Sequence, residues 1–351
     1  MLEDGSEFYG MSFGYEKSVS GEVVFNTAMT GYPESLTDPS YRGQILVLTY
    51  PLIGNYGVPD DVKDQNIARY FESDLLHISG LVVSDYSVEF SHWNANRSLA
   101  DWLKTSKIPG IFGIDTRHIT KILREKGTML GKIIYENEDV ELYDPNKENL
   151  VAQVSIKQQE IYGSGKYKVI LIDCGVKYNI IRDLLQKDIT VIRVPWDYCF
   201  LNETYDGLFI SNGPGDPKQC GATINNLREA IQQDIPIMGI CLGNQLMALA
   251  SGADTYKLKY GHRSHNQPVI QVNTNRAYVT AQNHGYAINN DSLQRGWDPF
   301  FINLNDQTNE GMKHIHKPFF STQFHPEASG GPTDTEFLFD QFIDLIEKYR
   351  K

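Results

Sequence analysis

Cys241 is the residue of this chain best placed for chemistry. It ends an apolar, strand-like run (236–241) and opens a predicted helix, with Gly239 and Gly243 on either side. This order of strand, tight turn and helix is the elbow that exposes the nucleophile in GxSxG enzymes. A helix N-terminus favours a thiolate and directs the backbone N–H of Leu242 toward charge on an attacked carbonyl. Judged by the cysteine alone, a buried structural thiol is an equally good interpretation.

His325 is the candidate base for Cys241. It ends an aromatic, strand-like run, and Glu327 follows two residues later. Residues i and i+2 of an extended backbone share a side, so the carboxylate could fix the imidazole tautomer and stabilise its charged form. Pro326 between them has a fixed φ that helps to hold the pair. The three side chains would form a triad recognised by role rather than by sequence order. The alternative is a surface turn with a solvated carboxylate.

Other histidines look less suited to chemistry. His262 and His265 are spaced HxxH, and His314 and His316 flank a single residue, but no carboxylate or cysteine set completes a ligand shell. We therefore expect no metal site.

The tetrapeptide GSGK (163–166) is not a phosphate loop. Tyr167 follows the lysine where the pattern needs Ser or Thr, and the motif precedes a strand-like run instead of following one. A flexible connector explains it better.

The composition is that of an acidic globular chain of 351 residues, a length that suggests two domains. Lys and Arg number 32 against 44 Asp and Glu, a formal net charge of −12, so we expect neither nucleic acid nor a membrane as partner. Four cysteines without a CxxC pair indicate a reducing compartment. The N-terminus resembles no signal or transit peptide. We expect a cytoplasmic protein.

The elements that must position these residues follow an α/β pattern. Residues 1–150 indicate a mixed β/α domain, residues 151–166 a polar linker and residues 167–351 a second domain. In the second domain, strand-like runs alternate with amphipathic helices, which predicts a mostly parallel sheet with helices on both faces. Ligands bind such sheets at the carboxyl ends of the strands. The turn that holds Cys241 and the loop SNGPGDP (211–217) fall at that edge.

The expected elements are short. Strands are predicted at 21–26, 44–49, 81–83, 168–173, 190–194, 207–213 and 236–241, and helices at 97–107, 118–126, 178–187, 223–233 and from about 243.

Three separated motifs together resemble the class I (triad-type) glutamine amidotransferases. They are SNGPGDP (211–217), GICLGNQ (239–245) and QFHPE (323–327). The resemblance implies the fold of that family for the second domain.

Further motifs, most of them in the first half of the chain, narrow the resemblance to one kind of amidotransferase. Residues 25–57, GIDTR (113–117) and DCGVKYN (173–179) resemble the small, glutaminase chain of carbamoyl phosphate synthetase, so that the likeness covers almost the whole sequence. YPLIGNYG and VPWDY are most similar to the glutaminase region of the eukaryotic multifunctional pyrimidine-synthesis polypeptide. This chain could thus be a piece of a longer protein.

The resemblance implies a role for each matching residue. Cys241 would attack the side-chain amide of glutamine, His325 would protonate the leaving ammonia and then activate water, and Glu327 would orient His325. The backbone amides of Gly213 and Leu242 would hold the oxyanion. The substrate-binding residues would be Ser40, Gly213, Gly215, Leu242, Gln245, Asn283, Gly285 and Tyr286. Because Ser40 belongs to the first domain, the glutamine pocket would lie near the domain boundary.

The sequence departs from the family pattern in three places. Asn244 stands where histidine is frequent, Tyr286 where phenylalanine is frequent, and Ser264 where glycine is usual. The first two flank the expected pocket and bear on substrate affinity. Cys220 closely follows the oxyanion loop, and we expect its modification to disturb that loop.

The resemblance also implies a partner. The ammonia would pass to an ATP-grasp synthetase, either a large subunit or a fused domain, which would make carbamoyl phosphate for pyrimidine or arginine synthesis. ATP and Mg²⁺ would bind only that partner, and this chain would need no cofactor. Two other interpretations stay open at this point: a cysteine hydrolase that works without a synthetase, and an inactive module that only regulates one.

Overall fold

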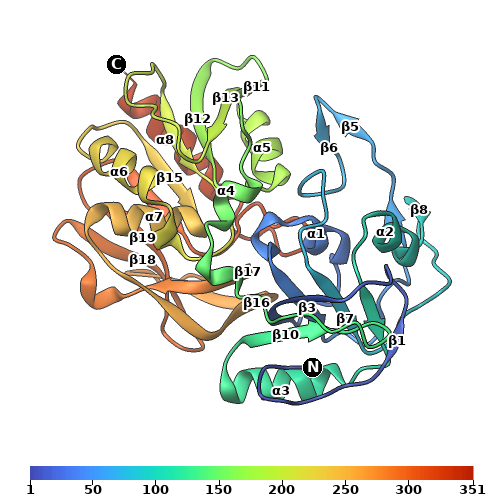
Figure 1. The fold of residues 1–351 in the computed structure, drawn as a ribbon. Coiled ribbons are helices and arrows are strands. Elements are labelled where there is room, and N and C mark those ends of the chain that lie inside the picture. Colours follow the sequence, from blue (N-terminus) through green and yellow to red (C-terminus); the bar gives the residue numbers. More distant parts are fainter. Residues whose placement is uncertain (351) are drawn as a thin grey trace. The chain divides into compact units, whose positions relative to one another are not determined.

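The computed structural model describes residues 1–350 and divides into two compact units. The first unit is Met1–Glu148, and the second begins at Asn149 (Figure 1). The segment expected as a linker, residues 151–166, contains part of helix α4 (Leu150–Val154) and strand β11 (Glu160–Tyr162) and belongs to the second unit. These elements are too short to show a periodic pattern in the sequence.

The first unit is built on a six-stranded sheet of order β1-β9-β7-β3-β2-β10. Its four central strands are parallel, and β1 and β10 pair antiparallel at the two edges. The elements are β1 Met11–Ser12, β2 Val19–Asn26, α1 Tyr32–Thr37, η1 Pro39–Tyr41, β3 Gln44–Leu48, β4 Val58–Pro59, β5 Lys63–Asp64, β6 Ile67–Ala68, β7 Gly80–Val83, β8 Ala95–Arg97, α2 Leu99–Thr105, β9 Gly110–Phe112, α3 Thr116–Lys126, β10 Met129–Ile133 and η2 Pro145–Lys147.

The second unit is built on a ten-stranded sheet of order β11-β13-β12-β14-β15-β20-β19-β18-β16-β17. Besides α4 and β11, its elements are β12 Tyr167–Asp173, α5 Tyr178–Leu185, β13 Ile189–Pro195, β14 Gly207–Ile210, η3 Pro217–Gln219, α6 Gly221–Ala230, β15 Ile237–Ile240, α7 Leu242–Ser251, β16 Thr255–Gln271, β17 Ala277–Ile288, η4 Asn290–Ser292, β18 Trp297–Asn303, β19 Asn309–His314, β20 Phe319–Thr322 and α8 Phe337–Tyr349.

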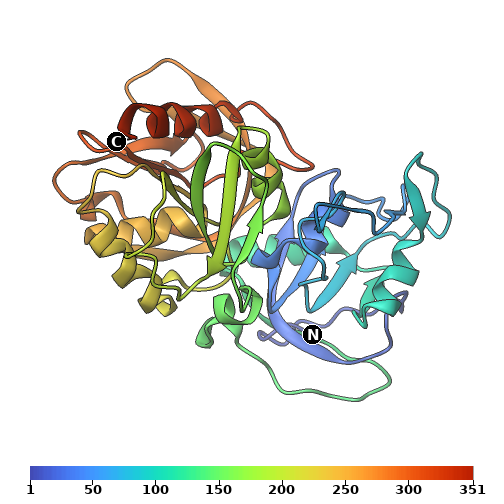
Figure 2. The same ribbon diagram turned by 90° about the horizontal axis from the view of Figure 1, so that it is seen from above.

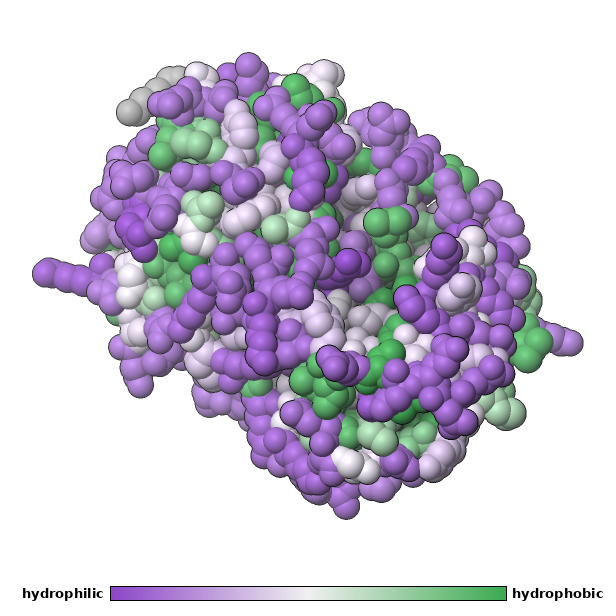
Figure 3. Space-filling view, viewed as in Figure 1, coloured by the Kyte–Doolittle hydropathy of each residue, from purple (hydrophilic) through white to green (hydrophobic). Residues whose placement is uncertain are grey.

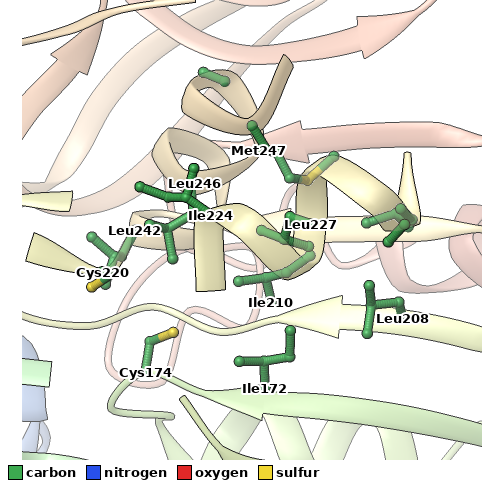
Figure 4. Packing of buried hydrophobic residues seen from close by; sticks show 14 of the residues in the cluster. Ile172, Cys174, Leu208, Ile210, Cys220, Ile224, Leu227, Leu242, Leu246 and Met247 are labelled. Atoms are coloured by element: carbon green, nitrogen blue, oxygen red, sulfur yellow. The ribbon is translucent and has the colours of Figure 1, made fainter. Parts of the chain in front are cut away.

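Helices cover both faces of this sheet, as the alternating pattern predicts (Figure 2). Phe209 of β14 packs against Phe339 and Phe342 of α8. Its neighbours Leu208 and Ile210 point to the opposite face and join the core under α6 and α7 (Figure 4). Successive residues of a strand face opposite sides of a sheet, so one apolar run serves two cores.

The parallel strands β13, β12, β14, β15 and β20 form the centre that the sequence predicts. The sheet continues beyond β20 through four antiparallel strands, β19, β18, β16 and β17, which the sequence analysis did not anticipate. Strand β16 is long and polar, with irregular register against β17, so it lacks the alternation that marks a strand in a sequence.

The surface is mostly polar. Hydrophilic residues predominate on the face seen in Figure 3, with hydrophobic ones scattered among them. Within residues 1–350, no helix combines the length and apolar character needed to cross a membrane.

Candidate active site

Cys241 occupies the turn between β15 and α7. Its φ of 54° and ψ of −102° are unusual for a residue with a side chain, as expected for a strained nucleophile elbow. Gly239 and Gly243 explain how the helix packs so closely after the strand. A Cβ on Gly239 would meet the Gly243 backbone at 2.7 Å, and a Cβ on Gly243 would meet the Ile210 carbonyl oxygen at 2.2 Å. The two glycines are therefore a packing requirement of the elbow.

His325 reaches the same sheet edge because its strand, β20, lies beside β15. Thr322 is the register partner of Ile240, so the residues after both strands emerge together. The backbone N–H of Cys241 donates to the Thr322 carbonyl at 2.8 Å, and the N–H of His325 donates to the Ala281 carbonyl at 2.9 Å. Neighbouring parallel strands thus place the candidate nucleophile and the candidate base side by side.

Glu327 contacts His325 as the spacing predicts. The Glu327 Oε1 lies 2.7 Å from Nδ1 of His325, and both side chains are buried. The same oxygen accepts a hydrogen bond from Lys177 Nζ at 2.9 Å. Asn179 holds the Glu327 backbone by donating to its carbonyl. Both come from the start of α5, directly after β12.

These contacts set the charges of the site. Burial opposes ionisation of Glu327, but Lys177 and His325 lower its pKa to about 2. Burial likewise opposes the imidazolium, but the carboxylate of Glu327 and the thiol of Cys241 raise the pKa of His325 to about 10. The structure therefore favours an ionised carboxylate and a charged imidazole.

Nε2, the other imidazole nitrogen of His325, lies near Cys241. Within residues 1–350, Nε2 of His325 is buried and has no hydrogen-bond partner of normal geometry, although Cys241 is near enough to affect the pKa of the ring. The Cys241 Sγ donates to the Asn283 carbonyl at 3.6 Å. The sulfur thus lies beside the imidazole nitrogen that carries the proton when Cys241 is a thiolate and His325 is charged.

The loop 211–217 follows β14 at the same edge. Ser211 Oγ accepts from the N–H of Cys174 at 2.9 Å, and Asn212 Oδ1 accepts from the N–H of Lys177 at 3.0 Å. A Cβ on Gly213 would come within 2.1 Å of the Cys174 carbonyl oxygen and 2.8 Å of the Leu242 side chain. Gly213 therefore lies against the first residue of α7, next to the elbow.

Buried amides connect the elbow helix to the segment 283–286. Gln245 Nε2 donates to the Tyr286 carbonyl at 3.0 Å and to Gln323 Oε1 at 3.1 Å. Asn244, which replaces a frequent histidine, donates to the same Gln323 oxygen at 3.1 Å and accepts from Ser321 Oγ at 2.7 Å. Asn244 is fully buried, so this departure from the family pattern fills a structural position.

The structure thus brings most of the predicted residues together within the second unit. Ser40 lies in the first unit, in η1, where its N–H donates to Asp38 Oδ1 at 2.9 Å. Its assignment to the substrate site stays a prediction.

Three features of the site could not be recognised in the sequence. Lys177 is part of the quoted motif DCGVKYN, but only the fold shows that it contacts Glu327. Arg263 is buried and opposes Asn283 in the β16–β17 register. His265 lies near the site as well, where burial, Lys177 and His325 lower its pKa to about 4.

His262 belongs to a buried group with a histidine and a carboxylate from neighbouring strands. His262 lies against His284, with Nδ1 and Nε2 3.2 Å apart, and Glu310 joins them. Glu310 is distant in the sequence and arrives through β19, so the spacing of the histidines could not reveal this group.

The family described as "Glutamine amidotransferase class-I" matches residues 170–345. The family described as "Carbamoyl-phosphate synthase small chain, CPSase domain" matches residues 1–133. The second unit therefore contains a class I glutamine amidotransferase domain, which accounts for the elbow and for the parallel centre of the sheet.

Three relatives cover nearly the whole chain. The arginine-specific small chain of carbamoyl phosphate synthase from Saccharomyces cerevisiae is 52% identical over 99% of this chain and 88% of its own length. The multifunctional protein CAD of Squalus acanthias is 53% identical over 98% of this chain. The human mitochondrial carbamoyl-phosphate synthase [ammonia] is 50% identical over 99% of it.

The chain belongs to the family of carbamoyl-phosphate synthase small chains, and it is the glutamine amidotransferase component of such an enzyme. It spans only 16% of the Squalus protein and 24% of the human one. The resemblance inferred from the motifs is confirmed.

Proposed function

We propose that this chain hydrolyses glutamine to glutamate and ammonia through Cys241, His325 and Glu327. The observation that carries the proposal is the orientation of His325. Its Nδ1 is held by Glu327 at 2.7 Å, while its buried Nε2 is left for the neighbouring thiol. A cysteine activated by an oriented histidine is the arrangement for acyl transfer from an amide.

In the first half of the reaction, the thiolate of Cys241 bonds to the amide carbon of glutamine, and the carbonyl electrons move to oxygen. The backbone N–H groups of Gly213 and Leu242 would stabilise this oxyanion, and losing one such donor costs about 2.7–4 kcal/mol of barrier. The C–N bond then breaks, and the leaving nitrogen takes a proton from His325. Ammonia and a glutamyl thioester result.

In the second half, His325 removes a proton from water, and the resulting hydroxide attacks the thioester carbon. The C–S bond breaks, which releases glutamate and returns the thiolate. Glu327 would keep the imidazole in the required tautomer throughout. Gly215, Gln245, Asn283, Gly285 and Tyr286, with Ser40 from the first unit, are proposed to hold the α-amino and α-carboxylate groups of glutamine.

We further propose that the ammonia passes to a synthetase with an ATP-grasp site, present as a separate large subunit or a fused domain, which makes carbamoyl phosphate from it with bicarbonate and ATP. Relatives named as a small chain and relatives several times longer than this chain support both arrangements. ATP and Mg²⁺ would bind that partner. The product would serve pyrimidine or arginine synthesis, and we expect a cytoplasmic location.

The first experiment measures ammonia release from glutamine by the purified chain beside Cys241→Ser, with the exposed Cys199→Ser as control. We expect release by the wild type and the control only, with a glutamyl adduct on Cys241 detected by mass spectrometry after acid quench. Release that survives in Cys241→Ser would refute the nucleophile.

The partner is tested separately. Adding the chain to a large synthetase subunit should make carbamoyl phosphate synthesis dependent on glutamine, while synthesis from ammonium stays unchanged. Complementation of yeast strains that need arginine or uracil then identifies the pathway.

A further inference from the structure

His262, His284 and Glu310 form a second buried cluster in the amidotransferase domain. They come from β16, β17 and β19, and their exposed fractions are 7%, 4% and 0%. His262 Nδ1 lies 3.2 Å from His284 Nε2 and 3.3 Å from Glu310 Oε1. The third side of the triangle, from His284 Nε2 to Glu310 Oε1, is 3.8 Å.

The outer nitrogens of the two imidazoles are already used. His262 Nε2 faces Asp306 Oδ2 at 2.8 Å, and His284 Nδ1 faces the Tyr286 carbonyl at 2.8 Å. An ionised carboxylate and a carbonyl only accept hydrogen bonds, so both outer nitrogens carry the proton. Burial opposes a second proton on His262, but Asp306 and Glu310 raise its pKa to about 9. When that proton is absent, the inner nitrogens of both imidazoles present lone pairs to each other and to the Glu310 oxygen, so three acceptors converge without a donor.

This arrangement has the form of a zinc site. In the plane of the three inner atoms, the point equidistant from them lies about 2.0 Å from each, the usual Zn–N and Zn–O distance. Asp306 and the Tyr286 carbonyl stand where outer partners orient the histidine ligands of a metal. The other Glu310 oxygen, Oε2, is buried without a hydrogen-bond partner among residues 1–350. Gln282 Oε1, 3.2 Å from His284 Nε2, offers a fourth oxygen.

We propose that His262, His284 and Glu310 bind one zinc ion. His284 stands between Asn283, whose carbonyl holds the thiol of Cys241, and Tyr286, whose carbonyl holds Gln245. The ion fixes this stretch of β17 to β16 and β19. Its role is structural, because the ligands are buried and it lies in a cluster separate from His325.

The alternative to a bound zinc ion is a proton on the inner nitrogen of His262. An imidazolium at this position would donate to its neighbours and satisfy the same contacts. The experiment must therefore separate a bound metal from a shared proton.

The test uses the full chain with Cys241→Ser and Cys199→Ser, so that neither the candidate nucleophile nor the exposed thiol can bind zinc. The protein is stripped with a chelator and titrated with Zn²⁺ by competition against a chromophoric chelator. Glu310→Gln keeps the shape of the side chain, and His262→Asn removes one imidazole. The matched controls are Glu229→Gln and His316→Asn, both at exposed positions.

We expect one zinc per chain, unchanged in both controls and at least about 100-fold weaker in each cluster variant. The X-ray absorption spectrum should show only nitrogen and oxygen ligands, with imidazole scattering. Circular dichroism checks that the variants fold. If His262→Asn does not fold, the near-isosteric Glu310→Gln decides the result. No binding by the parent chain, or binding equal in cluster and control variants, would overturn the proposal and leave a protonated His262 as the explanation.

Discussion

The amidotransferase domain buries two histidine–carboxylate clusters that share residue types and differ in their neighbours. In the first, Glu327 contacts His325 and Lys177. In the second, Glu310 contacts His262 and His284. Lys177 and His325 lower the pKa of Glu327 to about 2 against the effect of burial, whereas burial raises the pKa of Glu310.

The comparison shows that the group beside a buried His–Glu contact determines what that contact can do. This group is Lys177 in the first cluster and His284 in the second. Lys177 keeps Glu327 ionised, and the ionised carboxylate can hold an imidazolium while its Nε2 remains available to Cys241. In the second cluster, both nitrogens of His262 and both of His284 have partners. That cluster can bind a cation or a proton, but it has no nitrogen left for a nucleophile.

The largest effect is expected from Cys241→Ser, because Cys241 is the proposed nucleophile and lies beside the first cluster. Glutaminase kcat should fall by at least about 10³-fold, since a serine hydroxyl is far less ionised than a thiol. The measurement is ammonia release under saturating glutamine. Cys199→Ser should retain wild-type kcat, and a matching loss in that control would point to a general thiol effect.

Without Lys177, the carboxylate of the first cluster would lack a lysine partner. Lys177→Met leaves the buried carboxylate of Glu327 without its lysine partner, so the free energy of unfolding should drop by about 3–5 kcal/mol. Urea unfolding measures this change. Lys168→Met, at an exposed position of β12, is the matched control. Equal stability of the two variants would show that the lysine does not balance the charge.

Matched glutamine substitutions separate the two carboxylates by kinetics. Glu327→Gln should lower kcat by roughly 10²-fold, because the imidazole loses the group that orients it and stabilises its charge. Glu310→Gln acts through the segment that holds Asn283 and Tyr286, so it should raise the KM for glutamine by about 2- to 10-fold and affect kcat less. The same kcat loss in both variants would contradict the distinction.

The smallest effect is a difference in pH dependence. The raised pKa of His325 contributes stability that is complete below the ordinary histidine pKa, about 6.5, and is lost as pH rises toward about 10. Glu327→Gln removes the carboxylate that causes the shift, so this loss should disappear. Urea unfolding at intervals from pH 6 to 10 tests it, and parallel curves for wild type and variant would refute the assignment.

The sequence alone determined the features that depend on local spacing. The glycines around Cys241 predict the elbow, and the two-residue separation of His325 and Glu327 predicts their contact, because a strand–turn–helix and an extended tripeptide leave few conformations. The apolar runs that become β12 to β15 are predicted for the same reason. Motifs in fixed order then identify the amidotransferase domain.

Only the tertiary structure decided the contacts between distant segments. Lys177 and Glu327 are 150 residues apart, and His262 meets Glu310 through strands whose polar, irregular sequence gives no periodic signal. The pKa of each carboxylate depends on burial and on the charges that the fold brings within a few ångströms, and neither quantity is a property of the local sequence. For this reason the candidate nucleophile can be predicted from the sequence, while the group that sets the charge of each histidine cluster can be identified only from the tertiary structure.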